Sequence, residues 1–458
     1  MLTKLKYPLL FAAFLSLLVI SGCKIGPNYK RPDYGVGKQY RFSVSADTVS
    51  FADTSWTYLF KDSVLQGMIR KGLQNNFDMN IAYQRVNQAM AMFKEARADL
   101  YPSLGVTGVA AYNNQAVPNG GGTLEYHDFY ATANLTWELD IWGKLRRAKE
   151  SARADMLAQK AYQQAVRISL IANIAAAYFD LIELTDELQI TQFTVSLRQK
   201  SLELVRNKLI AGTVSGLSVA QAEAQLAEAT TRIPSLEQAV AKQENALRFL
   251  LGELPGPVIT GDSIIDQMNF DIIPAEGIPS QLIVRRPDII YAEEQLVSAN
   301  AQVGVARGKM LPTLAISADL GYSYLGAGII GSAVGNLVAP IFNMGKLKAN
   351  LRRSQAFKEE MLLSYQKAIY NGLTEVSDGI ISVDKQKKVV EESVKLTAAA
   401  QTAYDLSYQL FNAGYASYLD VMDAQRMLYN AQINQSQEFT YQMLSIVDLY
   451  LALGGGWK

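Results

Sequence analysis

Cysteine and histidine, two residue types common in catalytic and metal sites, are scarce in this 458-residue chain, and no cluster of catalytic residue types is apparent. It has one cysteine, Cys23, and one histidine, His127, so neither an intrachain disulfide nor a pair of histidine metal ligands is available. Glycine-rich runs such as 120–122 lack the lysine and the strand-to-helix context of a phosphate-binding loop. His127 lies beside an expected surface loop, where a solvated side chain is the simpler interpretation. We expect no enzyme and no metal site.

The single cysteine ends an export signal. Lys4 and Lys6 make a positive start, an apolar stretch covers 9–20, and small residues follow. That stretch is too short to cross a membrane, which takes about 20 residues. The sequence Ile20-Ser21-Gly22-Cys23 is similar to the bacterial lipobox, whose cysteine is acylated; an ordinary signal with an incidental cysteine is the alternative.

A lipid on Cys23 would hold the mature amino terminus at a membrane, because each buried methylene contributes about 0.8 kcal/mol. We expect no cofactor apart from this covalent lipid. Lys24 follows the cysteine where an aspartate would favour retention at the inner membrane, so the outer membrane is favoured. Without the signal, 41 basic residues stand against 43 acidic ones, which makes nucleic acid an improbable partner.

The body of the chain consists of two copies of one repeat unit. Trp142-Gly143-Lys144 returns as Met344-Gly345-Lys346, Ala211-Gly212 as Ala413-Gly414, and Leu251-Gly252 as Leu453-Gly454, all at a shift of 202. An earlier landmark, 96–104, returns at 306–314 with a shift of 210. Repeats of solenoids are 20 to 50 residues long, so this is a duplicated half rather than an array.

Each half contains a very long predicted helix. Residues 144–210 are strong helix formers with apolar positions at spacings of three and four, and 347–411 repeat the design. Sixty-seven helical residues extend about 100 Å. Gly212 and Gly414 then end the helices. Return helices are expected over 217–251 and 419–453.

The other kind of segment alternates apolar and polar residues with a period of two. Four strands are expected, over 103–113, 126–139, 313–325 and 332–341, each with one apolar and one polar face. A hydropathy window over 311–342 would alternatively suggest a transmembrane helix, but its five glycines and its period of two favour strands.

Strands of about ten residues with this alternation match a transmembrane barrel. Four strands cannot close a barrel, because such barrels begin at eight. Several copies of the chain must therefore combine, with their long helices forming a hollow bundle and the loop 113–126 facing outward. A periplasmic coiled-coil scaffold without strands is the rival architecture.

Five motifs carry a resemblance to a known family, and they run in order along nearly the whole mature chain. They are Gly26-Pro27-Asn28-Tyr29-Lys30-Arg31-Pro32, Trp137-Glu138-Leu139-Asp140-Ile141-Trp142-Gly143-Lys144, Arg285-Arg286-Pro287-Asp288, Pro340-Ile341-Phe342-Asn343-Met344-Gly345-Lys346-Leu347 and Ala413-Gly414-Tyr415-Ala416-Ser417-Tyr418-Leu419-Asp420-Val421. The chain resembles the lipoprotein branch of the TolC-like outer-membrane efflux family.

The resemblance implies an α+β membrane protein: a homotrimer with a 12-stranded barrel, four strands per chain, continuous with a helical barrel in the periplasm of a Gram-negative bacterium. The expected divisions are a signal peptide (1–22), an equatorial segment (23–76), a first repeat (77–252), an equatorial connector (253–286), a second repeat (287–454) and a tail (455–458). It also implies a periplasmic adaptor and an inner-membrane pump of the resistance-nodulation-division type as partners.

Site residues follow from the same resemblance. The family closes its resting tip with a leucine, an aspartate and an arginine, which match Leu419, Asp423 and Arg426. Spacings of four and three put these residues on one helical face. Clustered carboxylates repel one another, so the ring would favour cations and respond to acid. An ordinary helix start, with Asp420 and Asp423 favoured by the helix dipole, is the alternative.

The hairpin tips are expected to receive the adaptor. They contain Gly212, Thr213, Ser215, Gly414, Tyr415 and Ser417. Passive export of drugs or other small toxic compounds is the expected function, and an exit duct for type I protein secretion is the alternative. The sequence names neither the exported compound nor the pump.

Overall fold

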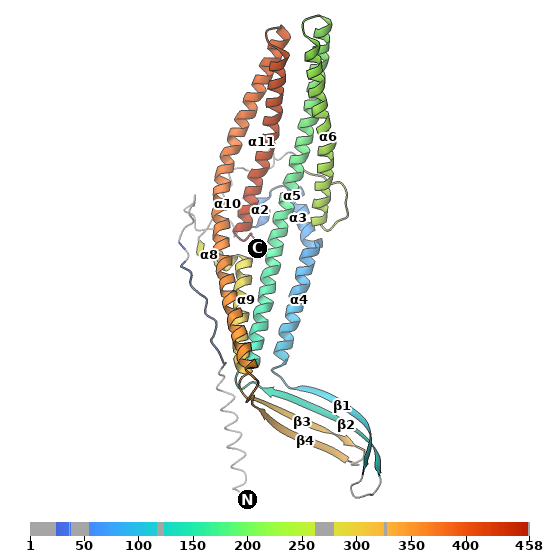
Figure 1. The fold of residues 1–458 in the computed structure, drawn as a ribbon, viewed down its shortest axis with the longest axis vertical. Coiled ribbons are helices and arrows are strands. Elements are labelled where there is room, and N and C mark those ends of the chain that lie inside the picture. Colours follow the sequence, from blue (N-terminus) through green and yellow to red (C-terminus); the bar gives the residue numbers. More distant parts are fainter. Residues whose placement is uncertain are drawn as a thin grey trace. The chain divides into compact units, whose positions relative to one another are not determined.

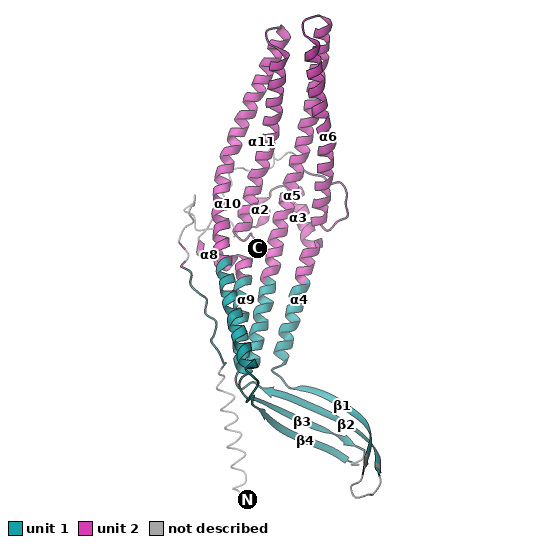
Figure 2. Ribbon diagram, viewed as in Figure 1, with its two compact units in different colours: residues 1–34, 84–160, 291–367 teal, residues 35–83, 161–290, 368–458 magenta. Residues whose placement is uncertain are grey.

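The structure is a computed structural model that describes residues 24–35, 37, 55–116, 123–261, 279–324 and 328–456. The chain forms two compact units (Figure 2). Unit 1 contains residues up to Tyr34 with Gln84–Lys160 and Tyr291–Lys367, and unit 2 contains the rest. Each unit takes matching segments from both halves. The packing therefore divides the chain differently from the sequence duplication.

Each half has the same order of elements (Figure 1). The first half comprises α4 (Phe77–Ala98), β1 (Ser103–Ala116), β2 (Thr123–Leu139), α5 (Lys144–Ile210) and α6 (Gly216–Leu250). The second comprises α9 (Pro287–Gly308), β3 (Thr313–Ser323), β4 (Gly328–Val338), α10 (Lys346–Ala413) and α11 (Tyr418–Ala452). The predicted long and return helices are confirmed to within two residues at each end. Three shorter helices were not predicted: α2 (Trp56–Leu59), α3 (Ser63–Asn75) and α8 (Pro279–Arg285).

The four strands form one antiparallel sheet in the order β1-β2-β3-β4. The transmembrane-helix interpretation of 311–342 is therefore wrong, and so is the strand-free scaffold. β4 begins four residues earlier than predicted and ends at Val338, before Pro340, which has no N–H to donate to a ladder. Among the described residues, one helix, α5, contains a window apolar and long enough to cross a membrane, and 56% of that window is buried. That burial fits a core helix.

The two faces of the sheet differ in polarity, as the alternation predicts. Asn134 pairs with Asp319 on one face, and Ala133 pairs with Leu320 on the other. The apolar face is open in the single chain, with Leu104 75%, Val106 80% and Ile329 82% exposed. Apolar patches of this kind mark contact with lipid or with another molecule.

On the polar face, β2 and β3 leave no room for a side chain at one position. Gly321 pairs with Thr132, whose side chain is buried there. A Cβ added at Gly321 would lie 2.7 Å from the Cα of Thr132, so only glycine fits. Close approach of this kind is where glycine occurs within strands.

Unit 2 has an aromatic core. Phe60, which follows α2, lies 6.4 Å from Phe179 on α5 and 6.4 Å from Tyr450 on α11, measured between ring centroids. Tyr178 donates a hydrogen bond to the N-cap residue Asp62 of α3. These contacts attach the short helices to α5 and α11.

Candidate functional site at the hairpin tips

Two helical hairpins of unit 2, α5–α6 and α10–α11, end in turns of the same design. Gly212 and Gly414 have φ of 75° and 84°, the left-handed conformation that ends helices. Thr213 N donates to Lys208 O, and Tyr415 N donates to Leu410 O, both at 2.9 Å. The predicted glycine turns are thus present in both halves.

Behind the turns, both hairpins share one hydrophobic cluster. It contains Leu202, Val205, Ala222, Ala400, Tyr404, Phe411, Tyr418, Val421, Leu428 and Ala431. Phe411 and Tyr418 bring their ring centroids within 5.7 Å. The Nζ of Lys208 lies 4.9 Å from the Phe411 ring and donates to Asn412 O at 3.3 Å. The two tips of one chain are therefore attached to each other.

The three predicted gate residues lie on the first turns of α11. Leu419 is 50% exposed although it is apolar, and Asp423 and Arg426 are also exposed. Arg426 Nη2 donates to Asp423 Oδ1 at 3.0 Å. An exposed pair three residues apart contributes little to stability, so its side chains are free to meet other groups.

Helix capping accounts for Asp420 but not for Asp423. Ser417 and Asp420 form a capping box: Ser417 Oγ accepts from Asp420 N at 3.3 Å, and Ser417 N donates to Asp420 Oδ2 at 2.8 Å. Ser417 Oγ also donates to Asp420 Oδ2 at 2.8 Å. The hydrogen bonds that the carboxylate accepts from Ser417 Oγ and Ser417 N hold the pKa of Asp420 below its usual range. Asp423 takes no part in the cap. The ordinary helix-start interpretation thus explains one of the two carboxylates.

The residues predicted to receive an adaptor are all solvent-exposed in the single chain. Tyr415 is 84% exposed, and the other five are exposed as well. Ile210 and Leu217 of the first tip are also exposed, at 86% and 67%. The structure places these residues at the two turns, while the predicted lipid-bearing Cys23 lies outside the described residues.

Sequence reasoning missed how residues 24–34, here called the strap, pack in unit 1. Arg147 on α5 is 1% exposed. It donates to the carbonyl oxygens of Ile25 and Gly26 at 3.0 and 2.9 Å and to Asn28 Oδ1 at 2.9 Å. The Gly26-Pro27-Asn28 motif was visible in the sequence, but its partner Arg147 was not.

The strap continues to an ion pair on α9. Arg31 donates to both oxygens of Glu293, at 2.6 and 2.7 Å, and Tyr29 donates to the same carboxylate at 3.0 Å. The hydrogen bond to Glu293 raises the pKa of Arg31. Burial, with the charge of Glu293, raises the pKa of Tyr365 on α10 to about 12. Both side chains keep their protonated forms at neutral pH.

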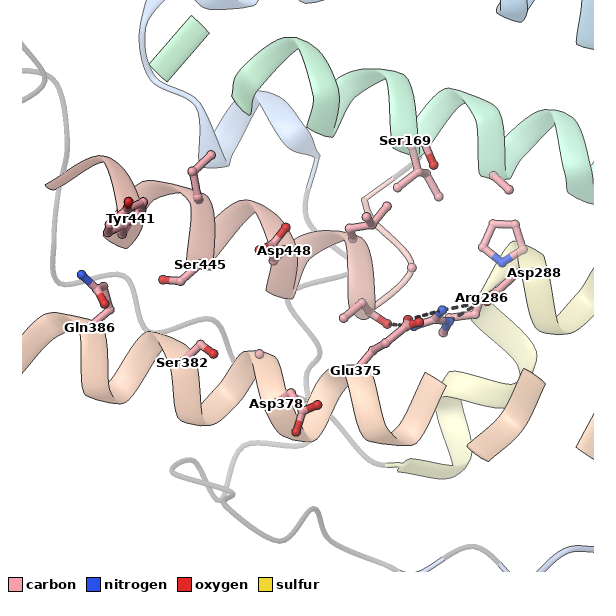
Figure 3. A pocket seen from close by; sticks show the side chains of 18 of the residues that line it. Ser169, Arg286, Asp288, Glu375, Asp378, Ser382, Gln386, Tyr441, Ser445 and Asp448 are labelled. Atoms are coloured by element: carbon pink, nitrogen blue, oxygen red, sulfur yellow. Dashed lines mark hydrogen bonds and ion pairs between the residues drawn. The ribbon is translucent and has the colours of Figure 1, made fainter. Parts of the chain in front are cut away.

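Three residues of the Arg285-Arg286-Pro287-Asp288 motif, from Arg286 to Asp288, line a pocket of about 900 Å³ in unit 2 (Figure 3). Arg286 donates to Ala452 O at 2.7 Å and pairs with Asp288 at 2.7 Å and Glu375 at 2.6 Å. Burial lowers the pKa of Arg286, but the two carboxylates more than offset it and the pKa is raised. Arg286 thus attaches the end of α11 to α10.

Comparison with known proteins decides the family. The profile of the outer membrane efflux protein family matches residues 68–253 and 278–455, which make up most of the chain. The chain belongs to the outer membrane efflux protein family. It is therefore an outer-membrane channel protein rather than an enzyme, and its helical part extends into the periplasm.

Individual members of the efflux family align over nearly the full length. The chain is 29% identical to the cation efflux system protein CusC of Escherichia coli O6:H1, with 97% of this chain and 98% of CusC covered. It is 31% identical to the solvent efflux pump outer membrane protein SrpC of Pseudomonas putida, with 97% of each covered. A crystal structure of CusC superposes with a TM-score of 0.85 at 27% identity, covering 95% of this chain and 100% of that one.

These findings confirm the predicted family, the α+β channel fold and the outer-membrane location. They also identify the chain as an efflux exit duct in general terms. The roles of Cys23, the three gate residues and the six tip residues stay predictions.

Proposed function

We propose that three copies of the chain form one conduit, with a 12-stranded barrel in the outer membrane, through which a periplasmic adaptor and an inner-membrane pump expel small toxic compounds. The observation that carries the proposal is the open sheet. β1 and β4 are the two edges of the sheet, since each pairs with one described strand only, and the apolar face is exposed. Joining β4 of one copy to β1 of the next removes both edges, and lipid covers the apolar face.

The gate of this conduit is the ring of Leu419, Asp423 and Arg426 from three copies. Support comes from their joint exposure on α11 and from the separate role of Asp420 in the helix cap. Three leucines would make an apolar constriction, and three carboxylates would favour cations. Opening the ring would require α10–α11 to move relative to its copies.

The duplication offers a matched control for this gate. At the shift of 202, Leu217 corresponds to Leu419, whereas Gln221 and Ala224 stand in place of Asp423 and Arg426. The first hairpin thus has the exposed leucine without the charges. We propose the second hairpin as the gate and both tips as the surface that meets the adaptor.

Conductance across planar bilayers tests the conduit and its gate together. Purified full-length protein should form low-conductance channels. The double variant Leu419→Ala, Asp423→Ala should raise that conductance, and Leu217→Ala should leave it unchanged. If the double variant keeps the low conductance, these residues do not form the gate. A preparation that forms no channels would contradict the conduit.

Docking of the adaptor is tested by crosslinking. Cysteines introduced by Ser215→Cys and Ser417→Cys should give adducts with the adaptor, and one introduced by Thr230→Cys, an exposed position in the body of α6, should not. Equal adducts at all three positions would contradict docking at the tips. Incorporation of labelled palmitate, lost in Cys23→Ser, would test the lipid.

The named relatives favour efflux of small compounds over secretion of a protein. CusC is named for cations and SrpC for solvents, at similar identity to this chain. Such divergence among close relatives is expected when the inner-membrane pump selects the compound. The substrate of this conduit is therefore to be sought by deleting the gene of this chain and measuring sensitivity to cations and to solvents.

A further inference from the structure

The polar face of the sheet carries a hydrogen-bonded chain of side chains that crosses all four strands. Thr107 Oγ1 on β1 donates to Asn134 Oδ1 on β2 at 2.7 Å. Asn134 Nδ2 donates to Asp319 Oδ1 on β3 at 2.6 Å and to Thr132 Oγ1 at 3.2 Å. Ser332 Oγ on β4 donates to Asp319 Oδ2 at 3.2 Å. These five residues are here called the polar belt.

Asp319 is the only charge in this belt. Both of its oxygens accept hydrogen bonds from neutral groups. No lysine or arginine in the described part of the chain forms an ion pair with it, whereas Glu138, on the same face, pairs with Lys144 at 2.6 Å. The belt therefore holds a carboxylate in a defined place and leaves its charge uncompensated.

We infer that the polar belt is a cation-selective ring in the outer-membrane barrel, separate from the gate at the hairpin tips. The inference rests on the proposed trimer, in which Asp319 would recur on every fourth strand around the lumen. Rings of carboxylates favour cations over anions in channels. The ligands are hydrated small cations and cationic cargo.

Dimensions decide under which conditions the ring acts. Twelve strands about 4.8 Å apart and tilted by about 40° enclose a cylinder about 24 Å across. A carboxylate that projects from the wall is then about 8 Å from the axis, which equals the Debye length of about 8 Å at 0.15 M salt. The ring should therefore act across the lumen at physiological or lower salt and lose its effect at 1 M, where that length is about 3 Å.

Thiol modification from the outer side tests the ring without passing the periplasmic gate. Ser317 lies on the polar face two residues from Asp319, and Leu320 lies on the apolar face. In outer membranes, the thiol introduced by Ser317→Cys should react faster with ethyltrimethylammonium methanethiosulfonate than with the anionic ethylsulfonate reagent. The thiol introduced by Leu320→Cys should be protected by lipid. The parent chain reports any reactivity of Cys23.

Adding Asp319→Asn to Ser317→Cys should lower the cation-to-anion rate ratio roughly seven-fold, since a change of about one kT in local potential alters each rate about 2.7-fold, in opposite directions. Asp128→Asn is the matched control. Asp128 shares the polar face, but on β2 it is six residues, or about 20 Å, from Asn134, beyond the Debye length of about 10 Å at 0.1 M. Its substitution should leave the ratio nearly unchanged.

The outcomes separate the ring from the conduit. A reactive thiol at 317, a protected one at 320 and a rate ratio unaffected by Asp319→Asn would overturn the ring and keep the barrel. Equal reactivity at both positions would overturn the barrel itself. Should the Asp319→Asn variant fail to assemble, the Ser317→Cys protein alone still decides, because a ratio that stays constant between 0.01 M and 1 M salt contradicts the ring.

Discussion

The two helical hairpins occupy corresponding places in the duplicated halves, yet their ends differ. Ser215, the N-cap of α6, makes no capping hydrogen bond with its side chain, whereas Ser417, the N-cap of α11, belongs to a capping box with Asp420. Gly216 opens α6 where the buried Tyr418 opens α11. The second hairpin therefore has the more firmly built start and also bears the charges of the proposed gate.

The long helices α5 and α10 also differ in charge and burial at corresponding positions. The positions of Asp180, Glu183 and Asp186 on α5 correspond to Ser382, Lys385 and Lys388 on α10. The three acidic groups of α5 are partly buried, whereas the two lysines are exposed and pair with Asp384. Duplication thus preserved backbone length and turn position while the side chains of the two copies took different environments.

The largest effect should come from removing the aromatic side chain of Tyr418, the first residue of α11. Tyr418→Ala takes a buried aromatic side chain out of the tip cluster, which should cost about 3 kcal/mol and speed hydrogen exchange in both tips. Its counterpart Gly216→Ala should be neutral or slightly stabilising, since nothing lies within 4 Å of an added Cβ. Hydrogen exchange read by mass spectrometry compares the two variants. Similar exchange in both would show that the cluster does not need Tyr418.

A smaller difference should separate the two N-caps. Ser417→Ala removes a capping box and should destabilise the start of α11 by about 1 kcal/mol. Ser215→Ala removes no capping hydrogen bond and should change the stability of the start of α6 much less. The exchange rates of the first turns of α11 and α6 measure this difference, and equal losses would contradict the asymmetry.

Acid should distinguish the two helix starts further. Hydrogen bonds from Ser417 lower the pKa of Asp420 in the folded chain. The folded state then binds the proton less tightly than the unfolded state, so the stabilisation is present above the unfolded pKa and is lost as pH falls through the folded pKa. Protection of the first turn of α11 should decrease there, while that of α6, which has Ser218 in the matching place, should not.

The smallest effect should come from the long helices. Burial raises the pKa of Glu183, so its ionised form destabilises the folded chain; this contribution to stability is intact below the unfolded pKa and lost as pH rises through the folded pKa. Glu183→Gln should therefore raise the melting temperature at pH 8 by more than at pH 4. Lys385→Gln, at the matched exposed position, should change it little at either pH. A gain in melting temperature for Glu183→Gln that is larger at pH 4 than at pH 8 would contradict burial as the cause of the raised pKa.

Much of the fold could be predicted because its determinants are local. The bounds of α5 follow from a proline-free run of helix formers ended by Gly212, and the faces of β2 and β3 follow from alternation alone. The gate candidates and tips were placed on the correct elements by motif likeness. The helices α2 and α8 were missed because four and seven residues are too few for a period to stand out. The 13 residues of α3 do carry a helical pattern, with Leu65, Ile69 and Gly72 on one buried face, and this signal was overlooked.

What the sequence by itself determined was the duplication, the length and type of each main element, and the polarity of each strand face, since periods of two and of 3.6 are visible in neighbouring residues. The tertiary structure alone decided that Arg147 holds the strap, that Asp420 caps a helix while Asp423 does not, and that Thr107, Asn134, Asp319 and Ser332 form one belt. These contacts depend on strand register and side-chain geometry between distant segments, which no local pattern specifies.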